Sequence, residues 1–376
     1  MSSCPTTGRP VDLSADLRGS ASLLDSVPDP RARRGRRHGL MPLLVLGIAA
    51  VLCGARSIAA IAQWAAAHAG SIRIDTRVAR AADESTFRRV IARVSADALA
   101  AVIGAWLWIR TRVVDGLRGI ALDGKTVRGA PRRGRSQDVA PHLVAAFDHT
   151  AGAVLGQVAV AAKSNEIPAV RTLLGSFDLA GAVVSVDAMH TQTDTATAIT
   201  EAGGEYVFTV KNNQPRLYAA LKKLPWADVA GHIAVDTGHG RRARRTIKVA
   251  TAPAWIPFAG AAQVAQIRRT VSGEGRKSVE VVYIITSADH HTASPSTLAG
   301  WVQGHWGIEN QLHWCRDVTF DEDRSQVRTG HAPQVMATIR STAISPLRLA
   351  GWANIAAALR HHARNPQRPV NLLLTC

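Results

Sequence analysis

Two aspartates follow short apolar runs, at positions where a buried charge needs a partner. The run Ile120-Ala-Leu122 leads into Asp123, and Ala182-Val-Val-Ser-Val186 leads into Asp187. Burying an unpaired carboxylate costs several kcal/mol, so both positions predict a bound cation or open solvent. Each also has a simpler explanation, because Asp123-Gly124 is a common turn pair and Asp187 can cap a helix that follows it.

A third acid, Glu309, lies in a segment rich in Trp, Ile and Leu that has helical spacing. Pairing with His305 or His313, four residues to either side, would explain it structurally. The same face could bind zinc, although it lacks the His-Glu-x-x-His spacing. Three carboxylates from separate elements favour Mg²⁺, which prefers oxygen ligands and keeps several waters. Two such ions about 4 Å apart activate a nucleophile and stabilise the leaving oxygen in a phosphoryl displacement.

The elements that must position these acids follow the order β-β-β-α-β-α-β. The hydrophobic pattern predicts strands at 119–127, 142–148, 154–161, 182–186 and 206–210, and helices at 164–174 and 191–202. Three antiparallel strands followed by crossover-linked strands are typical of the ribonuclease H fold, whose last helix would bring Glu309 to the two aspartates. We therefore predict an α/β fold with a ribonuclease H-like mixed sheet and flanking helices.

The rest of the chain divides into a tail, a helical domain and an insertion. The length of 376 residues suits two or three domains at about 150 residues each. We predict a flexible tail at 1–25, an all-α N-terminal domain at 26–115 and a catalytic domain at 116–376. Helices are expected at 40–54, 58–69 and 85–110, and a mostly β insertion at about 215–295. A last helical region is expected from about 298 to 362, with breaks, and it includes a continuous helix at 339–350. Pro346 lies inside this last helix and predicts a kink or a cost of about 3 kcal/mol.

The charge balance indicates a polyanionic partner. The chain has 45 Lys and Arg against 28 Asp and Glu, a formal net charge of +17, and such a surplus points to nucleic acid or an anionic membrane. A solvated surface explains any one of these cations equally well. The candidate DNA contacts are Lys125, Arg128, Arg132, Arg133, Arg135, Lys211, Asn213, Gln214, Arg241, Arg242, Arg244 and Arg245. Helical spacing predicts that Trp301, Trp306 and Trp314 lie in the core rather than at bases.

A membrane partner depends on one stretch, Gly39 to Ala55, which has 17 residues without a charge. This is the short limit for a bilayer span, and a buried helix of a soluble domain explains it better. Four scattered cysteines without a CxxC pair argue against a disulfide framework and fit a reducing cytoplasm.

Several motifs in order along the chain resemble one family. They are Ala121-Leu-Asp-Gly-Lys-Thr-Val-Arg128, Lys163-Ser-Asn-Glu166, Val186-Asp-Ala-Met-His-Thr-Gln192, Val210-Lys-Asn-Asn-Gln214 and His305-Trp-Gly-Ile-Glu-Asn-Gln-Leu-His-Trp314. They are similar to insertion-sequence DDE transposases that include the H-repeat-associated proteins, of the ribonuclease H-like superfamily. Residues 29–38, with Gly54-Ala-Arg-Ser57, resemble the domain that precedes the transposase domain in that family.

The resemblance implies that Asp123, Asp187 and Glu309 form the acidic triad and bind two Mg²⁺ ions, with Mn²⁺ as a substitute. It implies an enzyme of the cytoplasm and nucleoid that cuts double-stranded DNA at terminal inverted repeats and joins the 3′ ends to target DNA as a homodimer. Members of that family often carry Tyr-x₂-Arg before the glutamate and a basic residue seven positions after it. Val302, His305 and Arg316 stand at these positions, and His305 and Arg316 are further candidate DNA contacts.

Three other interpretations stay open at this point. A catalytically weakened, transposase-derived DNA-binding protein would follow if Pro346 disrupts its helix. A membrane-anchored regulator would use the apolar stretch near the N-terminus. A general metal nuclease would share the fold but would not depend on specific end sequences.

Overall fold

The computed structural model describes residues 23–34, 36–74, 77–78, 81–111, 113, 116–130, 140–161, 164–238, 240–273 and 276–375. Most of the predicted tail, together with Arg132, Arg133 and Arg135, lies outside the described residues.

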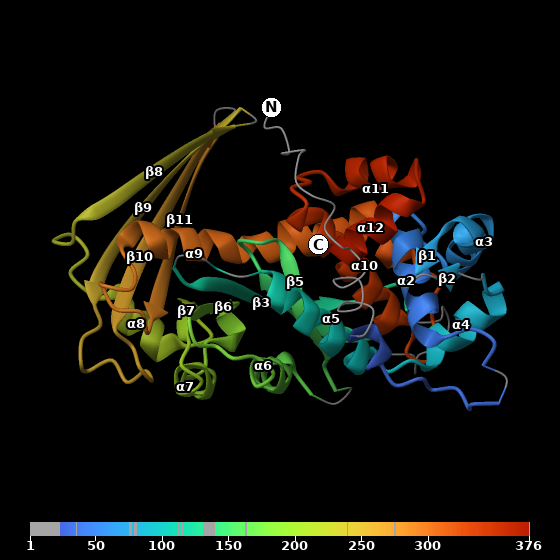
Figure 1. The fold of residues 1–376 in the computed structure, drawn as a ribbon. Helices are drawn as coiled ribbons and strands as arrows, with labels where there is room; N and C mark the ends of the chain where they lie inside the picture. Colours follow the sequence, from blue (N-terminus) through green and yellow to red (C-terminus); the bar gives the residue numbers. More distant parts are fainter. Residues whose placement is uncertain are drawn as a thin grey trace, which may run out of the picture.

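One nine-stranded mixed sheet extends from one end of the molecule, at β8, to its centre, at β5, in the order β5-β4-β3-β6-β7-β11-β10-β9-β8 (Figure 1). Its first five strands are β3 (Arg118–Thr126), β4 (His142–Asp148), β5 (Ala153–Ala159), β6 (Ala182–Val186) and β7 (Glu205–Val210). Strands β3, β4 and β5 pair antiparallel, whereas β3, β6 and β7 pair parallel. The predicted order of strands and helices is therefore found from residue 118 to residue 210.

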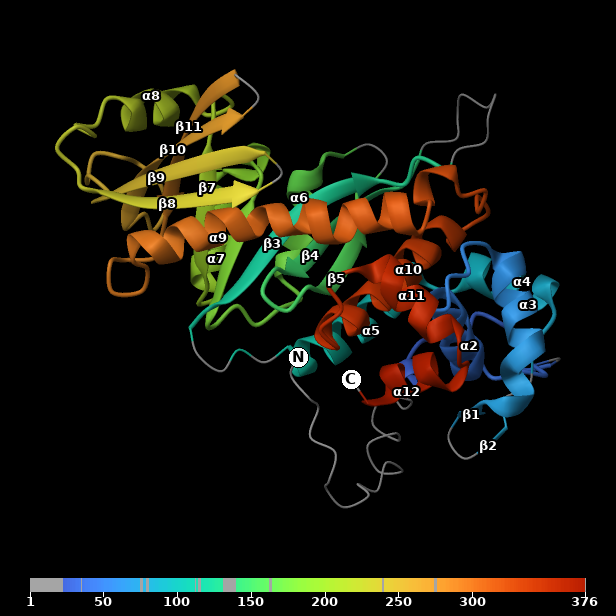
Figure 2. The same cartoon turned by 90° about the horizontal axis from the view of Figure 1, so that it is seen from above.

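The predicted insertion extends the same sheet. It opens with α8 (Pro215–Lys222) and continues as β8 (Gly231–Gly238), β9 (Arg241–Thr251), β10 (Gln263–Gly273) and β11 (Arg276–Thr286). Strand β11 pairs antiparallel with β7, so the four added strands lengthen the sheet beyond the edge at which β7 would otherwise end. Helix α9 (Pro295–Gly307) then crosses one face of the sheet, while α6 (Glu166–Leu174) and α7 (Thr193–Glu201) lie on the other (Figures 1 and 2).

The N-terminal part is mainly helical. It contains α2 (Leu40–Leu52), α3 (Ile58–His68), the 3₁₀ turn η1 (Ala69–Ser71), the two-residue strands β1 (Arg73–Ile74) and β2 (Arg77–Val78), α4 (Glu84–Arg93) and α5 (Ala96–Arg110). The single helix that we predicted over 85–110 is wrong, because Ser95 Oγ accepts the N–H of Ala98 and starts a new helix at a bend of 88°. The apolar α2 is buried almost throughout. Within the described residues, no single helix is long and apolar enough to cross a membrane.

Three C-terminal helices pack against this N-terminal part rather than against the insertion (Figure 2). They are α10 (Ala332–Leu349), α11 (Ile355–Ala363) and α12 (Gln367–Thr375). Helix α10 continues through Pro346, which lies near its end and whose carbonyl still accepts the N–H of Ala350 at 2.9 Å. The proline removes one hydrogen bond, from its missing N–H to the carbonyl of Thr342, and its place near the end of the helix limits the effect on α10.

A buried ion cluster ties the segment after α9 to α10. Arg316 Nη2 lies 2.6 Å from Glu322 Oε1, and Arg340 Nη1 lies 2.9 Å from Glu322 Oε2. All three side chains are almost fully buried. Burial raises the pKa of Glu322, but the two guanidinium groups outweigh burial and the net shift is downward.

We predict that Glu322→Gln lowers the free energy of unfolding by about 3–5 kcal/mol, because it leaves buried guanidinium charges without their counter-ion. Since the pKa of Glu322 is depressed in the fold, this stability is present above about pH 4.3 and is lost as the pH falls toward the folded pKa. Urea unfolding at pH 7 measures the difference. The matched control is Asp321→Asn, the same change one residue earlier at an αL position that Asn tolerates. Equal stability of the two variants would contradict this role.

Candidate active site

The register of the central strands brings the two predicted aspartates together. Leu122 of β3 is the parallel partner of Val186 of β6, so the next residues, Asp123 and Asp187, leave adjacent strands at the same end. Neighbouring strands lie about 4.8 Å apart, so the two carboxylates share one edge. Asp123 lies within β3, while Asp187 directly follows β6 and begins the 3₁₀ turn η2 (Ala188–His190).

The third acid comes from a helix that widens as it passes these aspartates. Helix α9 continues into two π-helical segments, η3 (Ile308–His313) and η4 (Cys315–Thr319), which carry Glu309, His313 and Arg316. Segment η3 packs on β3. The π-helical hydrogen bonding changes the angular spacing of side chains along the helix, and such segments are frequent at functional sites.

His313 joins two of the acids. Its Nδ1 lies 3.3 Å from Asp123 Oδ2 and 3.2 Å from Glu309 Oε2. Burial lowers the pKa of His313, but the hydrogen bonds to the two carboxylates outweigh it and the net shift is upward. The same hydrogen bond from His313 lowers the pKa of Glu309. One ligand atom from each of these three residues lies within 4.8 Å of the other two, a spacing that suits a metal ion.

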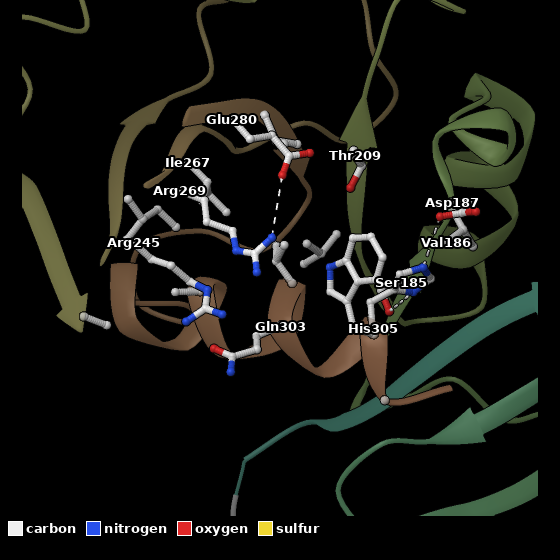
Figure 3. Close-up of a pocket in the computed structure, with 18 of the residues that line it drawn as sticks. Ser185, Val186, Asp187, Thr209, Arg245, Ile267, Arg269, Glu280, Gln303 and His305 are labelled. Atoms are coloured by element: carbon white, nitrogen blue, oxygen red, sulfur yellow. Dashed lines mark hydrogen bonds and ion pairs between the residues drawn. The ribbon is translucent and has the colours of Figure 1, made fainter. Parts of the chain in front are cut away.

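Asp187 has a histidine of its own (Figure 3). His305 Nε2 lies 3.4 Å from Asp187 Oδ1, and its Nδ1 lies 3.1 Å from Ser185 Oγ. This contact is the main reason why the pKa of Asp187 is lowered, and Lys211 lowers it further. Asp187 is close enough for its charge to oppose that of Glu309. The three acids predicted from the sequence therefore lie at one site.

The other predicted contact residues near this edge differ in what they touch. Lys125 is nearly buried, with Nζ 2.6 Å from Asp317 Oδ2, whereas Arg128 and Lys211 are exposed. Asn213 and Gln214 donate to the backbone carbonyls of Ala188 and Thr191, at 2.6 and 2.9 Å. Both amides thus hold the loop that follows Asp187.

A cleft of about 480 Å³ opens beside Asp187, between α9 and the added strands. Arg245, Arg269 and Glu280 face it from the sheet, and Gln303 faces it from α9 (Figure 3). Arg245 pairs with Asp236, and the remaining predicted arginines of β9, Arg241, Arg242 and Arg244, are exposed. Two cations of the insertion, Arg245 and Arg269, therefore line a hollow that leads to Asp187.

The tryptophans of α9 and its continuation were predicted to be core residues, which is correct for one of them. Trp301 is buried, but Trp306 and Trp314 are 60% and 55% exposed. Trp306 lines the cleft beside His305. The prediction failed because the apolar residues around Glu309 occupy more than one side of the helix, and only the packing decides which side is covered.

Arg316, which we expected at DNA, is not at the surface. Its side chain is 0% exposed and is bound by Glu322, with a further contact of 3.5 Å from Nη1 to Gln157 Oε1. Its charge is therefore used inside the fold. The sequence pattern did not predict this burial, because the position of its partner Glu322 depends on the turn after η4.

A second polar cluster was missed in the sequence. Glu166 Oε1 lies 2.5 Å from His142 Nε2, and Glu166 Oε2 lies 2.9 Å from His190 Nε2. The hydrogen bond from His190 is the main cause of the lowered pKa of Glu166. A Cβ on Gly124 would overlap the Glu166 carboxylate, so this cluster lies directly under the residue after Asp123. The sequence held two separate signals for this cluster. One was the Ser164-Asn-Glu166 motif, and the other was the glycine at position 124, directly after the candidate ligand Asp123.

Known proteins match almost the whole of this chain. The family described as Transposase DDE domain matches residues 115–345, and the one described as DDE_Tnp_1-associated matches residues 21–107. The chain therefore belongs to the DDE transposase family. Asp123, Asp187 and Glu309 all lie within the region matched by the Transposase DDE domain.

Two protein sequences from Escherichia coli agree with this assignment. The chain is 30% identical over 351 residues to "Putative transposase YncI" of Escherichia coli O157:H7, covering 87% of each. It is 31% identical over 337 residues to "H repeat-associated putative transposase YhhI" of Escherichia coli (strain K12), covering 85% of this chain and 88% of that one. A solved piggyBac transposase synaptic complex with hairpin DNA aligns with a TM-score of 0.40 and 11% identity, over 97% of this chain and 79% of that chain.

We predict that Gly124→Ala lowers the free energy of unfolding by about 1–3 kcal/mol, because the new methyl group displaces Glu166 from its two histidines. The control is Gly300→Ala on α9, where a Cβ meets no atom within 4 Å. That helical change should stabilise by about 0.5–1 kcal/mol. Urea unfolding of both variants tests the pair, and a Gly124 variant as stable as the wild type would mean that Glu166 is not held in place.

Proposed function

We propose that this protein is a DNA transposase that cuts the terminal inverted repeats of an insertion sequence and joins the freed 3′ ends to target DNA. The observation that carries the proposal is the convergence of Asp123 and Asp187, through the register of β3 and β6, with Glu309 from the helix above them. A site for phosphoryl transfer needs such a group of carboxylates at an open edge.

The strand order supports a ribonuclease H-like catalytic core. Strands β5-β4-β3-β6-β7, with three antiparallel and two further parallel strands, have the order that we expected for that fold. The insertion enters after β7 and returns into α9, which carries Glu309 at its end. In this proposal the insertion serves DNA binding, and the catalytic domain spans 116–376 with its N-terminal helical domain at 26–115.

The donor set fits Mg²⁺, since carboxylate oxygens are its preferred protein ligands. Asp123 and Asp187 would hold two ions, and Glu309 would complete one of the two sites. Ions bound there would supply activation of the attacking oxygen and neutralisation of charge on the phosphate. The residues of this chain do the positioning: β3 and β6 fix the aspartates, and the Arg316–Glu322–Arg340 cluster fixes the helix that carries Glu309.

The proposed substrate is double-stranded DNA, and the protein would act on it in the cytoplasm, at the nucleoid. Lys211 and Arg245 line the cleft, and Arg128, Arg241 and Arg244 are exposed. We propose that a phosphate backbone follows the two cleft residues to the acids and that the exposed arginines contact it farther away. Joining two ends requires at least two active sites, so we infer a homodimer on DNA. The weakened, non-catalytic alternative lacks its main support, because α10 passes through Pro346 without a break.

We predict that the wild type, with Mg²⁺, nicks a labelled duplex of the element end at its boundary and leaves a scrambled duplex intact. Asp187→Asn should reduce the rate at least about 100-fold, because metal stabilisation of the transition state is worth several kcal/mol. Asp194→Asn, an exposed acid on α7, is the control. Tight binding without any cleavage would favour the non-catalytic protein, and cleavage of both duplexes would favour a general nuclease.

We predict that Lys211→Gln weakens binding of element-end and scrambled duplexes by the same factor. Because each phosphate contact contributes about 0.9 to the slope of log K against log salt, the slope should fall by about that amount. Fluorescence anisotropy from low to moderate salt measures it. Arg360→Gln, an exposed cation on α11, should leave the slope unchanged. If both variants change the slope equally, the DNA does not pass preferentially along the cleft.

A further inference from the structure

We propose that His313 is a direct ligand of the metal ion held by Asp123 and Glu309, and that this nitrogen gives the site a preference for Mn²⁺ or Co²⁺ over Mg²⁺. The inference rests on the proposed function only in taking these two carboxylates as metal ligands. It adds a residue to the site and a chemical class of ion that the site selects.

The separations between the atoms carry the argument. Nδ1 of His313 lies 3.3 Å from the Asp123 oxygen and 3.2 Å from the Glu309 oxygen. Charge-assisted hydrogen bonds between nitrogen and carboxylate are shorter, at about 2.7–2.9 Å. Neighbouring ligands of an octahedral ion with bonds of about 2.1 Å are about 3.0 Å apart, and those of a tetrahedral ion about 3.4 Å. Both nitrogen–oxygen spacings fall in this range, and the ligand atoms of the three residues lie within 4.8 Å of one another, so the geometry points to a shared metal ion.

The surroundings of the imidazole hold one of its nitrogens toward the two carboxylates. The side chain is only 4% exposed and is fixed on the π-helical segment η3. Its Nε2 has no hydrogen-bond partner among the described residues. Nδ1 is therefore the nitrogen that faces both carboxylates, and Nε2 would carry the hydrogen of a neutral ring bound to a metal through Nδ1. Neutral imidazole is the form that binds metals.

His305 does not share this position. Of the three acids, it pairs with Asp187, at 3.4 Å, and its other nitrogen lies beside Ser185 Oγ. It is not part of the group whose ligand atoms lie within 4.8 Å of one another. The two histidines around Glu309 are therefore unequal, and only His313 adds nitrogen to the pair of carboxylates.

The consequence is a change in metal selectivity. Mg²⁺ is a hard ion that prefers oxygen, whereas imidazole suits later first-row ions, whose affinity for a nitrogen-containing site rises from Mn²⁺ to Co²⁺. Replacing the imidazole by an amide should weaken Mn²⁺ and Co²⁺ binding much more than Mg²⁺ binding. Replacing it by a carboxylate should move the preference toward Mg²⁺.

The test uses the full-length protein without DNA. Pulsed electron paramagnetic resonance of bound Mn²⁺ should show coupling to a ¹⁴N nucleus in the wild type, and this coupling should be lost in His313→Gln. Titration with Mn²⁺ should show a loss of affinity of at least about tenfold in that variant, since even groups that only support a ligand are worth about 10–100-fold. Competition with Mg²⁺ should show a smaller loss, and His313→Asp should recover Mg²⁺ binding.

Two controls separate ligation from a structural effect. His362→Gln removes a buried histidine on α11 and should keep the coupling. His305→Gln should keep it as well, and its loss there would overturn the assignment in favour of His305. If His313→Gln does not fold, the wild type grown with ¹⁵N-histidine must replace the ¹⁴N coupling by a ¹⁵N coupling that His305→Gln retains.

The remaining outcomes distinguish this inference from the proposed function. Bound Mn²⁺ without any nitrogen coupling, in a protein that cleaves element ends with Mg²⁺, overturns the role of His313 and leaves the transposase proposal intact. Nitrogen coupling in a wild type that cleaves no DNA supports the ligand assignment and removes the catalytic function. A wild type that binds no Mn²⁺ overturns the assignment directly.

Discussion

The mutual repulsion of three carboxylates at one end of the sheet is the constraint on which the rest of this structure depends. The register of β3 and β6 places Asp123 and Asp187 side by side, and the helix above them adds Glu309. His313 and His305 lower the pKa values of Glu309 and Asp187 through hydrogen bonds. Both histidines lie four residues from Glu309, so one helix supplies an acid and the two histidines whose hydrogen bonds offset the repulsion between the carboxylates.

That helix needs rigid support, because a shift along its axis would separate the acids. Its first turns pack on the strands of the insertion. These strands form one continuous surface with the central sheet because β11 pairs with β7. Its end is held by Arg316, which reaches Glu322 and through it Arg340 of α10. The buried cluster therefore connects the acidic site to α10, which packs on α2. Burying these charges is costly, and the ion pairs of Glu322 with Arg316 and Arg340 offset that desolvation cost.

Local patterns predicted the elements that carry the acids, whereas long-range pairing decided the features that were missed. Apolar runs bounded by turns identified the strands before Asp123 and Asp187, and the order of elements indicated which strands are neighbours. The joining of the insertion to β7 could not be predicted, since edge pairing leaves no local signal. Burial of Arg316 and exposure of Trp306 also depend on partners that the helical spacing does not identify. The break before Ser95 had a local signal in the serine cap, which a continuous apolar pattern obscured.

The pleat of β3 explains why Asp, Gly and Lys follow one another at the site. Successive side chains of a strand point to opposite faces. Asp123 meets His313 on the face covered by the helix, and Lys125 meets Asp317 on that same face. Gly124 faces the other side, where Glu166 occupies the space of a side chain and holds His142 and His190. His190 lies in the turn that begins at Asp187, so the cluster under Gly124 supports the loop that carries Asp187 from the opposite face of the sheet.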